Sequence, residues 1–338
     1  MPIPISHDLL ELSHRLLYSP KDFPELGLSL DDAPALLNRL RRRKAIQIPP
    51  PEILKAQADT AAGNGMRLLL SGEDDWPASL NNLPQLPPIL FLLGELPSLD
   101  RCIALVGSRR CSRQGREMAR MLGRGLASEG VSVVSGLARG IDGEAHEGAL
   151  EAGKTLAILG GGLDRIYPPE HRNLAGRILR SGALISEFPP GVMPLPFHFP
   201  RRNRIIAALS DLTIVVEAGE KSGARSTAIH SLDLGKRVGV VPGNPLNPAA
   251  AGSNQLFKEG AEPIRNLQDV HDLLKWGAGP KTSIPWSPER CLEEGVEDLE
   301  SLALRSGWTL ARSIENLESW ERDGQVRRLG GGRFKVSN

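Results

Sequence analysis

Cationic side chains recur in the loops of the central part of the chain, beside glycine and serine. They lie where we expect strands to end or helices to begin: Arg109, Arg110, Arg113, Arg139, Arg165, Arg201, Arg202, Arg204, Lys221 and Arg225. A guanidinium is permanently charged and donates forked hydrogen bonds, which suit phosphate oxygens. A compact nucleotide needs far fewer cations, so this set favours a polyanion that carries several phosphates.

Aromatic residues fall in the same loops, although they make up only 4% of the chain. They are Tyr167, Phe188, Phe197 and Phe199. Cations along a groove with interleaved rings are the usual design for single-stranded nucleic acid, because a ring can stack on any base. The pattern therefore predicts single-strand binding with weak sequence preference.

Two of the loops combine arginine with small residues. Residues 107–115 read GSRRCSRQG, and residues 135–143 read SGLARGIDG. Small residues let backbone N–H groups approach an anion, so we interpret both loops as anion-binding. A solvent-exposed loop with a helix cap would also explain Ser112, but not the neighbouring arginines. We interpret Asp142 as the N-cap of the helix that follows it.

No cofactor and no metal are expected. Residues 148–155, GALEAGKT, match the P-loop pattern, but here a helix ends and a strand begins, which is the reverse of a P-loop. No GxGxxG motif opens a helix directly, which argues against a nicotinamide cofactor. His146 has no partner at metal-ligand spacing, and neither do the cysteines.

Nucleotide hydrolysis is the alternative function. Arg204 and Glu217, close to a phosphate-binding loop, could orient a ribose phosphate and assist the loss of a base. Glu217 could equally cap a helix or pair with Arg204 or Arg225. We assign no catalytic residue, because the sequence offers no Ser/His/Asp set, carboxylate pair or metal cluster.

The loops belong to a regular alternation of strands and helices. Strands are expected at residues 102–106, 131–134, 155–159, 183–186, 212–216 and 238–241, with helices at 114–128, 143–151, 172–181, 203–209 and 224–234. This order predicts an α/β fold with a Rossmann-like, doubly wound parallel sheet over residues 101–276. Ligands of such sheets bind at the carboxyl ends of the strands. We expect residues 197–202 to be a loop and Asn203 to cap the next helix.

Other segments flank this domain. Residues 1–65 predict a small helical, SAM-like domain with a solvent-exposed basic run at 41–44. Residues 66–100 predict a strand at 66–70 and then an extended connector packed on the core, since its prolines exclude helix and central strand. A linker at 277–288 precedes a winged-helix-like domain at 289–338, with helices at 291–304 and 310–323.

The overall composition restricts the possible partners and location. The 338 residues carry a net charge of +1, so nucleic acid must be bound by a local patch. Three cysteines without a CxxC pair suit a reducing compartment. No stretch approaches the ~18 apolar residues of a membrane span. We expect a soluble, cytoplasmic protein with no membrane partner.

Six motifs follow one another along the chain: GSRRCSRQG, VVSGLARGIDGEAHEGAL, ILGGGLDRIYPPEHRNL, LISEFPPG, FHFPRRNRIIAALSD and VPGNPLNPAAAGSNQLFKEGA. In this order and spacing they closely resemble the DprA/Smf family of DNA-processing proteins of natural transformation. The similarity covers roughly residues 69–264. Residues 222–227, with Arg204 and Glu217, only partly match the related cytokinin-activating and lysine-decarboxylase-like proteins, so the hydrolase stays the alternative.

The resemblance implies an extended Rossmann domain that binds and protects incoming single-stranded DNA, forms a homodimer and loads the RecA recombinase. It implies no established catalysis. In the family, the GSxR loop and the FPxRN segment contribute to the DNA pocket. With the cations above, the residues expected to bind DNA are Gly107, Ser108, Arg109, Arg110, Arg113, Arg139, Phe199, Arg201, Arg202, Asn203, Arg204, Lys221 and Arg225.

Overall fold

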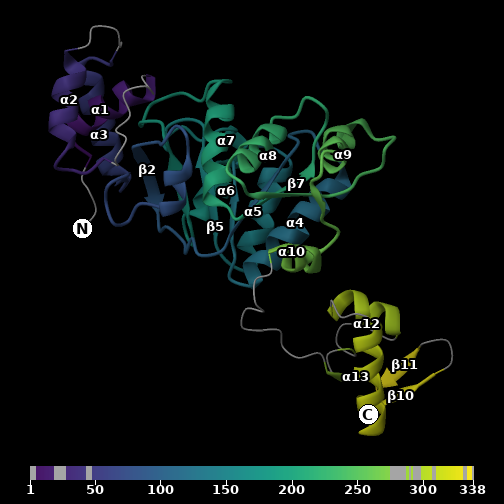
Figure 1. Ribbon diagram of the computed structural model, residues 1–338. Coiled ribbons are helices and arrows are strands. Elements are labelled where there is room, and N and C mark those ends of the chain that lie inside the picture. Colours follow the sequence, from purple (N-terminus) through teal and green to yellow (C-terminus); the bar gives the residue numbers. More distant parts are fainter. Residues whose placement is uncertain are drawn as a thin grey trace. The chain divides into compact units, whose positions relative to one another are not determined.

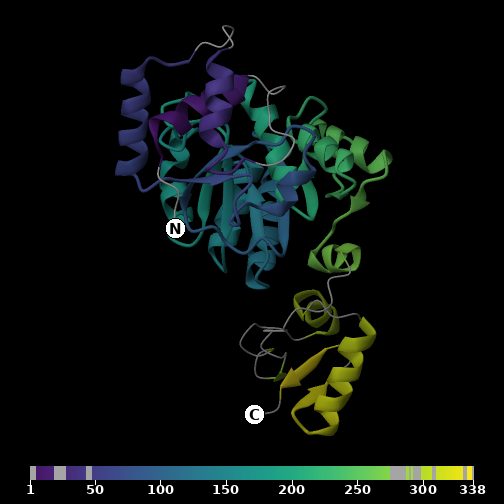
Figure 2. The same cartoon turned by 60° about the vertical axis from the view of Figure 1, so that its left-hand side comes forward.

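The computed structural model divides the chain into two compact units, residues 1–275 and 276–338, which are described separately. The described residues are 5–18, 28–42, 48–274, 287–288, 291, 298–306, 310–329 and 333–336. Figure 1 labels most of the helices and some of the strands, and Figure 2 shows the ribbon from a second direction.

One sheet organises the first unit, with nine strands among the described residues in the order β1-β2-β6-β5-β4-β3-β7-β8-β9. Neighbours from β6 to β9 are parallel. These strands are β3 (Cys102–Gly107), β4 (Ser132–Ser135), β5 (Thr155–Leu159), β6 (Ala183–Ser186), β7 (Leu212–Glu217), β8 (Arg237–Val240) and β9 (Glu262–Pro263). The strand order reverses between β3 and β7, which is where sheets of this kind bind ligands. The expected doubly wound, Rossmann-like fold is confirmed.

Helices cover both faces of the sheet (Figures 1 and 2). They are α4 (Arg113–Ser128), α5 (Ile141–Leu150), α6 (Arg172–Ile178), α7 (His198–Leu209), α8 (Ala224–Asp233), α9 (Ala251–Lys258) and α10 (Leu267–Leu274). Side chains alternate across each strand, so Leu156 and Ile158 of β5 pack with α7, whereas Ala157 and Leu159 pack with α6. Both faces of the strands are therefore apolar.

Helix α7 begins at His198, so our expectation of a loop at residues 197–202 was wrong. Asn203 lies inside the helix and does not cap it. Pro200 is tolerated because the first helical turn makes no use of its N–H group. The early start places Arg201 and Arg202 on a rigid helix instead of a loop.

The strand expected at residues 66–70 is confirmed as β1 (Arg67–Leu70). The segment after it, expected to be an extended connector, contains the short 3-10 helix η2 (Ala78–Asn82) and a further strand, β2 (Ile89–Gly94). β2 pairs with both β1 and β6 and so lies inside the sheet, which contradicts our exclusion of a central strand. The nearest prolines, Pro88 and Pro97, lie outside β2, so every residue of the strand has an N–H group.

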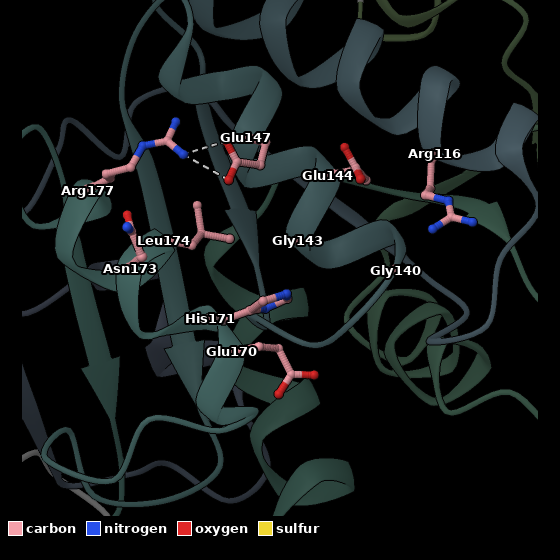
Figure 3. A pocket seen from close by; sticks show the side chains of 10 residues that line it. All are labelled: Arg116, Gly140, Gly143, Glu144, Glu147, Glu170, His171, Asn173, Leu174 and Arg177. Atoms are coloured by element: carbon pink, nitrogen blue, oxygen red, sulfur yellow. Dashed lines mark hydrogen bonds and ion pairs between the residues drawn. The ribbon is translucent and has the colours of Figure 1, made fainter.

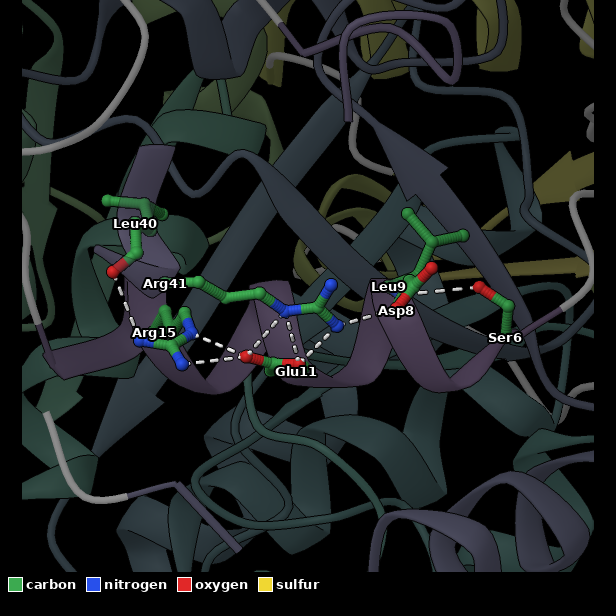
Figure 4. Close-up of polar contacts among 7 residues, drawn as sticks. All are labelled: Ser6, Asp8, Leu9, Glu11, Arg15, Leu40 and Arg41. Carbon is green, nitrogen blue, oxygen red and sulfur yellow. Dashed lines mark hydrogen bonds and ion pairs between the residues drawn. The ribbon is translucent and has the colours of Figure 1, made fainter. Parts of the chain in front are cut away.

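Among the residues described before the sheet are three helices, α1 (His7–Tyr18), α2 (Ala33–Arg41) and α3 (Pro51–Gly63). Glu11 of α1 accepts hydrogen bonds from Arg15 and Arg41, and Arg41 also binds Asp8 (Figure 4). Burial acts to raise the pKa of Glu11, but the two arginines outweigh it and lower that pKa. Arg41, which we expected only to face solvent, therefore fastens α2 to α1. Residues 43–44 of the basic run lie outside the described residues.

The second unit contains α12 (Leu299–Ser306), α13 (Leu310–Arg322) and an antiparallel hairpin of β10 (Val326–Arg328) and β11 (Phe334–Val336). Leu302, Leu317 and Trp320 of the helices pack with Val326 and Phe334 of the hairpin. The helix expected at 291–304 is described as α12 only from Leu299, and residues 277–286 of the linker lie outside the described part. The winged-helix assignment stays a prediction. Among the described residues, no helix is long and apolar enough to span a membrane.

Two glycines allow α4 and α5 to pack closely. A Cβ on Gly123 would lie 2.4 Å from the carbonyl oxygen of Ala145 on α5. A Cβ on Gly148 would lie 2.1 Å from the carbonyl oxygen of Arg120 on α4. Both distances are far below van der Waals contact, so any side chain at either position must push the helices apart.

We expect Gly123→Ala to lower the free energy of unfolding by about 1–3 kcal/mol, because the α5 backbone must move. Gly176→Ala on α6 is the matched control, since nothing lies within 4 Å of its added Cβ. It should be neutral or stabilise by ~0.5–1 kcal/mol. Denaturant unfolding followed by circular dichroism measures both, and equal stabilities would contradict the close helix contact.

Candidate nucleic-acid interface

The site is built where β3 and β7 end side by side. The Ser108 N–H donates to the Glu217 carbonyl oxygen at 2.7 Å. The Glu217 carboxylate accepts the Ser112 N–H at 2.7 Å and the Ser112 hydroxyl at 2.5 Å. Ser112 also accepts the N–H of Gly115, which makes it the N-cap of α4, the role that the alternative interpretation of this loop gave it. Glu217 is therefore buried and fastens the loop after β3 to the end of β7.

Asp142 joins the loops after β3 and β4. The N-cap of α5 is Gly140, so our interpretation of Asp142 as this cap was wrong. Its buried carboxylate instead accepts hydrogen bonds from the backbone of Ala138, Gly107 and Gly136, the last at 3.2 Å. These include amides that we expected to bind phosphate. The loops thus carry their own anion at this position.

Arg202 lies beneath the same loops, with only 3% of its surface exposed. It donates to the carbonyl oxygens of Gly136, at 2.7 Å, and Ile158. Burial lowers the pKa of Arg202 to about 10, opposed by the charge of Asp142. Burial likewise raises the pKa of Asp142, opposed by Arg202. A Cβ on Gly136 would lie 2.4 Å from the guanidinium, so this glycine makes room for it.

Glu187, at the end of β6, holds two further arginines. Arg201 donates to its carboxylate at 2.9 and 2.8 Å, and Arg204 at 2.6 Å. Burial acts to raise the pKa of Glu187, but Arg204 and Arg201 outweigh it and lower that pKa. Arg201 also donates to the carbonyl oxygen of Leu17 in α1. This cluster neutralises a buried carboxylate and fastens α1 to α7.

Three of the residues expected to bind DNA are therefore buried: Arg202, Asn203 and Arg204. The amide of Asn203 donates to the Gly223 carbonyl oxygen at 3.2 Å, next to the start of α8. Because each side chain is used inside the protein, we no longer count these three among the residues that touch DNA.

The exposed part of the site is a small cleft. Its lining residues are Arg109, Gly136, Ala138, Arg139, Tyr167, Pro168 and Phe199. The Arg109 guanidinium carbon lies 4.7 Å from the ring centroid of Phe199. The Tyr167 ring centroid lies 5.7 Å from that of Phe199, with the rings tilted by 41°. Loops after β3, β4 and β5 and the start of α7 thus bring two rings and two guanidinium groups together.

The other expected cations lie around this cleft or apart from it. Arg110, Arg113 and Lys221 are exposed, and Arg113 pairs with Glu117 at 2.7 Å. Arg225 is half-buried and pairs with Glu259 at 3.4 Å. Gly107 and Ser108 are half-buried, and the Ser108 hydroxyl donates to the Arg110 carbonyl oxygen at 3.0 Å. The structure brings Arg109, Arg139 and Phe199 together, whereas Lys221 and Arg225 do not line the cleft.

A larger hollow of about 430 Å³ lies between α5 and α6. Figure 3 shows the side chains that line it. Its charged lining is mixed, and Arg177 donates to Glu147 at 2.9 and 2.7 Å. Glu170 of the hollow pairs with Arg139 of the cleft, so this ion pair lies between the two. The mixed charge makes the hollow a poorer candidate for phosphates than the cleft.

We expect Arg202→Ala to lower the free energy of unfolding by about 3–5 kcal/mol, because Asp142 would keep a buried charge without its counter-charge. Arg109 is exposed, so Arg109→Ala should change the free energy of unfolding by no more than about 0.5 kcal/mol. Arg202→Lys keeps the charge, so its loss of stability should lie between those of the two alanine variants. Thermal and denaturant unfolding measure all three, and an Arg202→Ala protein as stable as the wild type would contradict the structural role.

Comparisons with known proteins identify the family. A family model described as DNA recombination-mediator protein A matches residues 67–275. Protein Smf of Escherichia coli (strain K12) is 36% identical over 288 residues, which cover 80% of this chain and 77% of that protein. DNA processing protein DprA of Streptococcus pneumoniae is 42% identical over 200 residues, covering 59% and 71%.

Two solved structures resemble the fold at 31% sequence identity. The X-ray structure of DNA processing protein A from Streptococcus pneumoniae has a TM-score of 0.59 and covers 79% of this chain and 93% of its own. A structure of the Helicobacter pylori protein, which addresses its single-stranded DNA binding mode, has a TM-score of 0.57 and covers 62% and 95%. The chain described here belongs to the DNA recombination-mediator protein A family.

Proposed function

We propose that this chain binds single-stranded DNA across the cleft of Arg109, Tyr167 and Phe199 and holds it without converting it. The observation that carries the proposal is the Arg109 guanidinium over the Phe199 ring, with Tyr167 beside it. Rings that stack on bases, with cations for the phosphates, suit a single strand better than a duplex, whose bases are already stacked.

A DNA-processing role follows from family membership. We propose that the chain acts on incoming strands during natural transformation, protects them and loads the RecA recombinase. The cytoplasm is the proposed location, because recombination with the chromosome takes place there. The single-stranded DNA binding described for the Helicobacter pylori relative supports the same ligand here.

The proposed DNA contacts are the accessible members of the expected set, with Tyr167 added. Arg109, Arg139, Phe199 and Tyr167 form the centre. Ser108, Arg110 and Arg113 extend it along the loop after β3, and Lys221 and Arg225 form a more distant cationic region after β7. Arg201, Arg202, Asn203 and Arg204 support the site from within, and Gly107 does so through its backbone bond to Asp142.

The hydrolase alternative is not favoured. It requires Arg204 and Glu217 to face a ribose phosphate. Arg204 is buried against Glu187, and the carboxylate of Glu217 is bonded to Ser112. Neither group is free to act on a substrate, so we propose a binding function.

We also propose that the chain forms a homodimer through the outer surface of α8 and α9. Ile229 and Leu232 of α8 are about half exposed, as is Phe257 of α9. An ion pair joins Arg225, in the first turn of α8, to Glu259, which directly follows α9. Three large exposed apolar side chains on these two helices suit a protein contact better than solvent.

Leu232→Glu with Phe257→Glu should convert the proposed dimer into a monomer, because buried unpaired charges oppose association. Met121→Glu, at a similarly exposed apolar position on α4, is the control and should leave the assembly unchanged. Sedimentation velocity measures all three proteins. A double variant that sediments as the wild type does would exclude this surface.

The wild type should bind a single-stranded oligonucleotide more tightly than the same sequence as a duplex, with affinity falling steeply as salt rises. Each phosphate neutralised contributes a slope of about −0.7 in log affinity against log salt. Arg109→Ala should weaken binding at least about ten-fold, because it loses a cation and its ring contact. Fluorescence anisotropy at several salt concentrations tests this, and unchanged binding by the variant contradicts the proposed site.

Glu170→Gln should tighten single-strand binding, because it frees Arg139 for a phosphate. An exposed ion pair is worth ~0.2–1 kcal/mol, so the gain should reach at most about five-fold. Glu151→Gln is the matched control, since Glu151 pairs with Arg120 outside the cleft. If both variants bind like the wild type in the same assay, Arg139 does not contact the DNA.

A further inference from the structure

An uncharged, apolar loop lies next to the cleft, immediately before α7. Residues 191–197 read GVMPLPF. Met193, Leu195 and Phe197 are all exposed, and Phe197 has 63% of its surface accessible. Three large exposed apolar side chains at alternate positions of one loop are costly in water and mark a surface that binds a partner or ligand.

The backbone of this loop is held in place. The Gly162 N–H donates to the Val192 carbonyl oxygen at 2.8 Å, and the Gly191 N–H donates to the Asp164 carboxylate at 2.8 Å. At the other end, the His198 N–H donates to the Leu195 carbonyl oxygen at 2.9 Å. Prolines within the loop also restrict its backbone. The exposed side chains therefore extend from an ordered support.

Phe197 is positioned by two buried rings. Its ring meets that of His198 edge-on, with centroids 4.6 Å apart and an interplanar angle of 82°. The His198 ring stacks on Phe188 at 4.1 Å and 28°. Both supporting rings are buried, whereas Phe197 faces solvent. A ring held in this way loses little conformational entropy when a second ring stacks on it.

The loop and the cleft share one support, the glycines that follow β5. A Cβ on Gly160 would lie 2.9 Å from the Phe199 ring. A Cβ on Gly161 would lie 3.0 Å from the backbone nitrogen of Pro194. Phe199 and the apolar loop therefore rest on adjacent residues, and the loop continues the surface of the cleft.

We propose that Met193, Leu195 and Phe197 form a second base-stacking platform, on which single-stranded DNA continues beyond the cleft. This inference rests on the proposed function. We assign unpaired bases to the platform because it adjoins the cleft and carries no charge. Base faces can stack on its apolar side chains, while the phosphates contact the arginines of the cleft. An apolar surface with few hydrogen-bonding groups binds any base, in keeping with weak sequence preference.

The test compares Phe197→Ala with the wild type on single strands of about 4 and about 16 nucleotides, the range of a single-strand site. The short strand fills only the cleft and should bind both proteins equally. The long strand should bind Phe197→Ala at least about five-fold more weakly, the equivalent of one lost stacked base. Met121→Ala, an exposed apolar position on α4, should bind both strands as the wild type does.

A direct readout uses Phe197→Trp, whose indole fluorescence should be quenched by the long strand when a base stacks on it. If the wild type and Phe197→Ala bind the long strand equally, and Phe199→Ala binds it weakly, the platform is excluded while the proposed function stands. The platform is likewise excluded if Phe197→Ala binds both strands as the wild type does but no longer binds a partner protein. If the wild type binds no single strand, the proposed function fails and the platform with it.

Discussion

The hydrogen bonds from backbone groups to the buried carboxylate of Asp142 are the constraint on which the site depends. They fasten the loop after β3 to the loop after β4, and Arg202 supports this joint from below. In Rossmann-like proteins that bind a nucleotide, amides at this edge of the sheet are left for the phosphate. Here the carboxylate of Asp142 occupies the amides that would otherwise bind a phosphate.

Because of these bonds, a ligand must bind to the exposed side chains of the loops and not to the inner backbone amides. With the inner amides bonded to Asp142 and Glu217 bonded to Ser112, the accessible chemistry consists of the side chains above them, chiefly Arg109 and Phe199. The inner arginines neutralise buried carboxylates, while the outer ones face solvent. A surface of this kind suits a polymer laid across it better than a small molecule enclosed by it.

The sequence predicts the parallel strands well because they are short apolar runs separated by helices of regular length, and the loops at residues 107–115 and 135–143 do follow strands. It predicts the cations of the cleft, because Arg109 and Arg139 lie beside small residues in loops that follow strands. It does not predict that Asp142 bonds to loop amides, because the sequence contains no information about which loop lies within reach.

The error at α7 had a detectable cause. With the helix started at Asn203, Arg202 is a loop residue and free to bind DNA. With the helix started at His198, Arg202 lies on the same face as Ile205, Ile206 and Leu209, the pattern of a buried stripe. Helical periodicity read from the true start would have placed Arg202 in the core. Proline at position 200 concealed that start.

Photochemical cross-linking of the full chain to single-stranded DNA, followed by mass spectrometry, tests the central claim most directly. That claim is that DNA lies over the outer side chains of the strand-end loops. The account predicts cross-linked peptides that contain Tyr167 or Phe199. Cross-links confined to the second unit, or to the far end of the sheet, would contradict it.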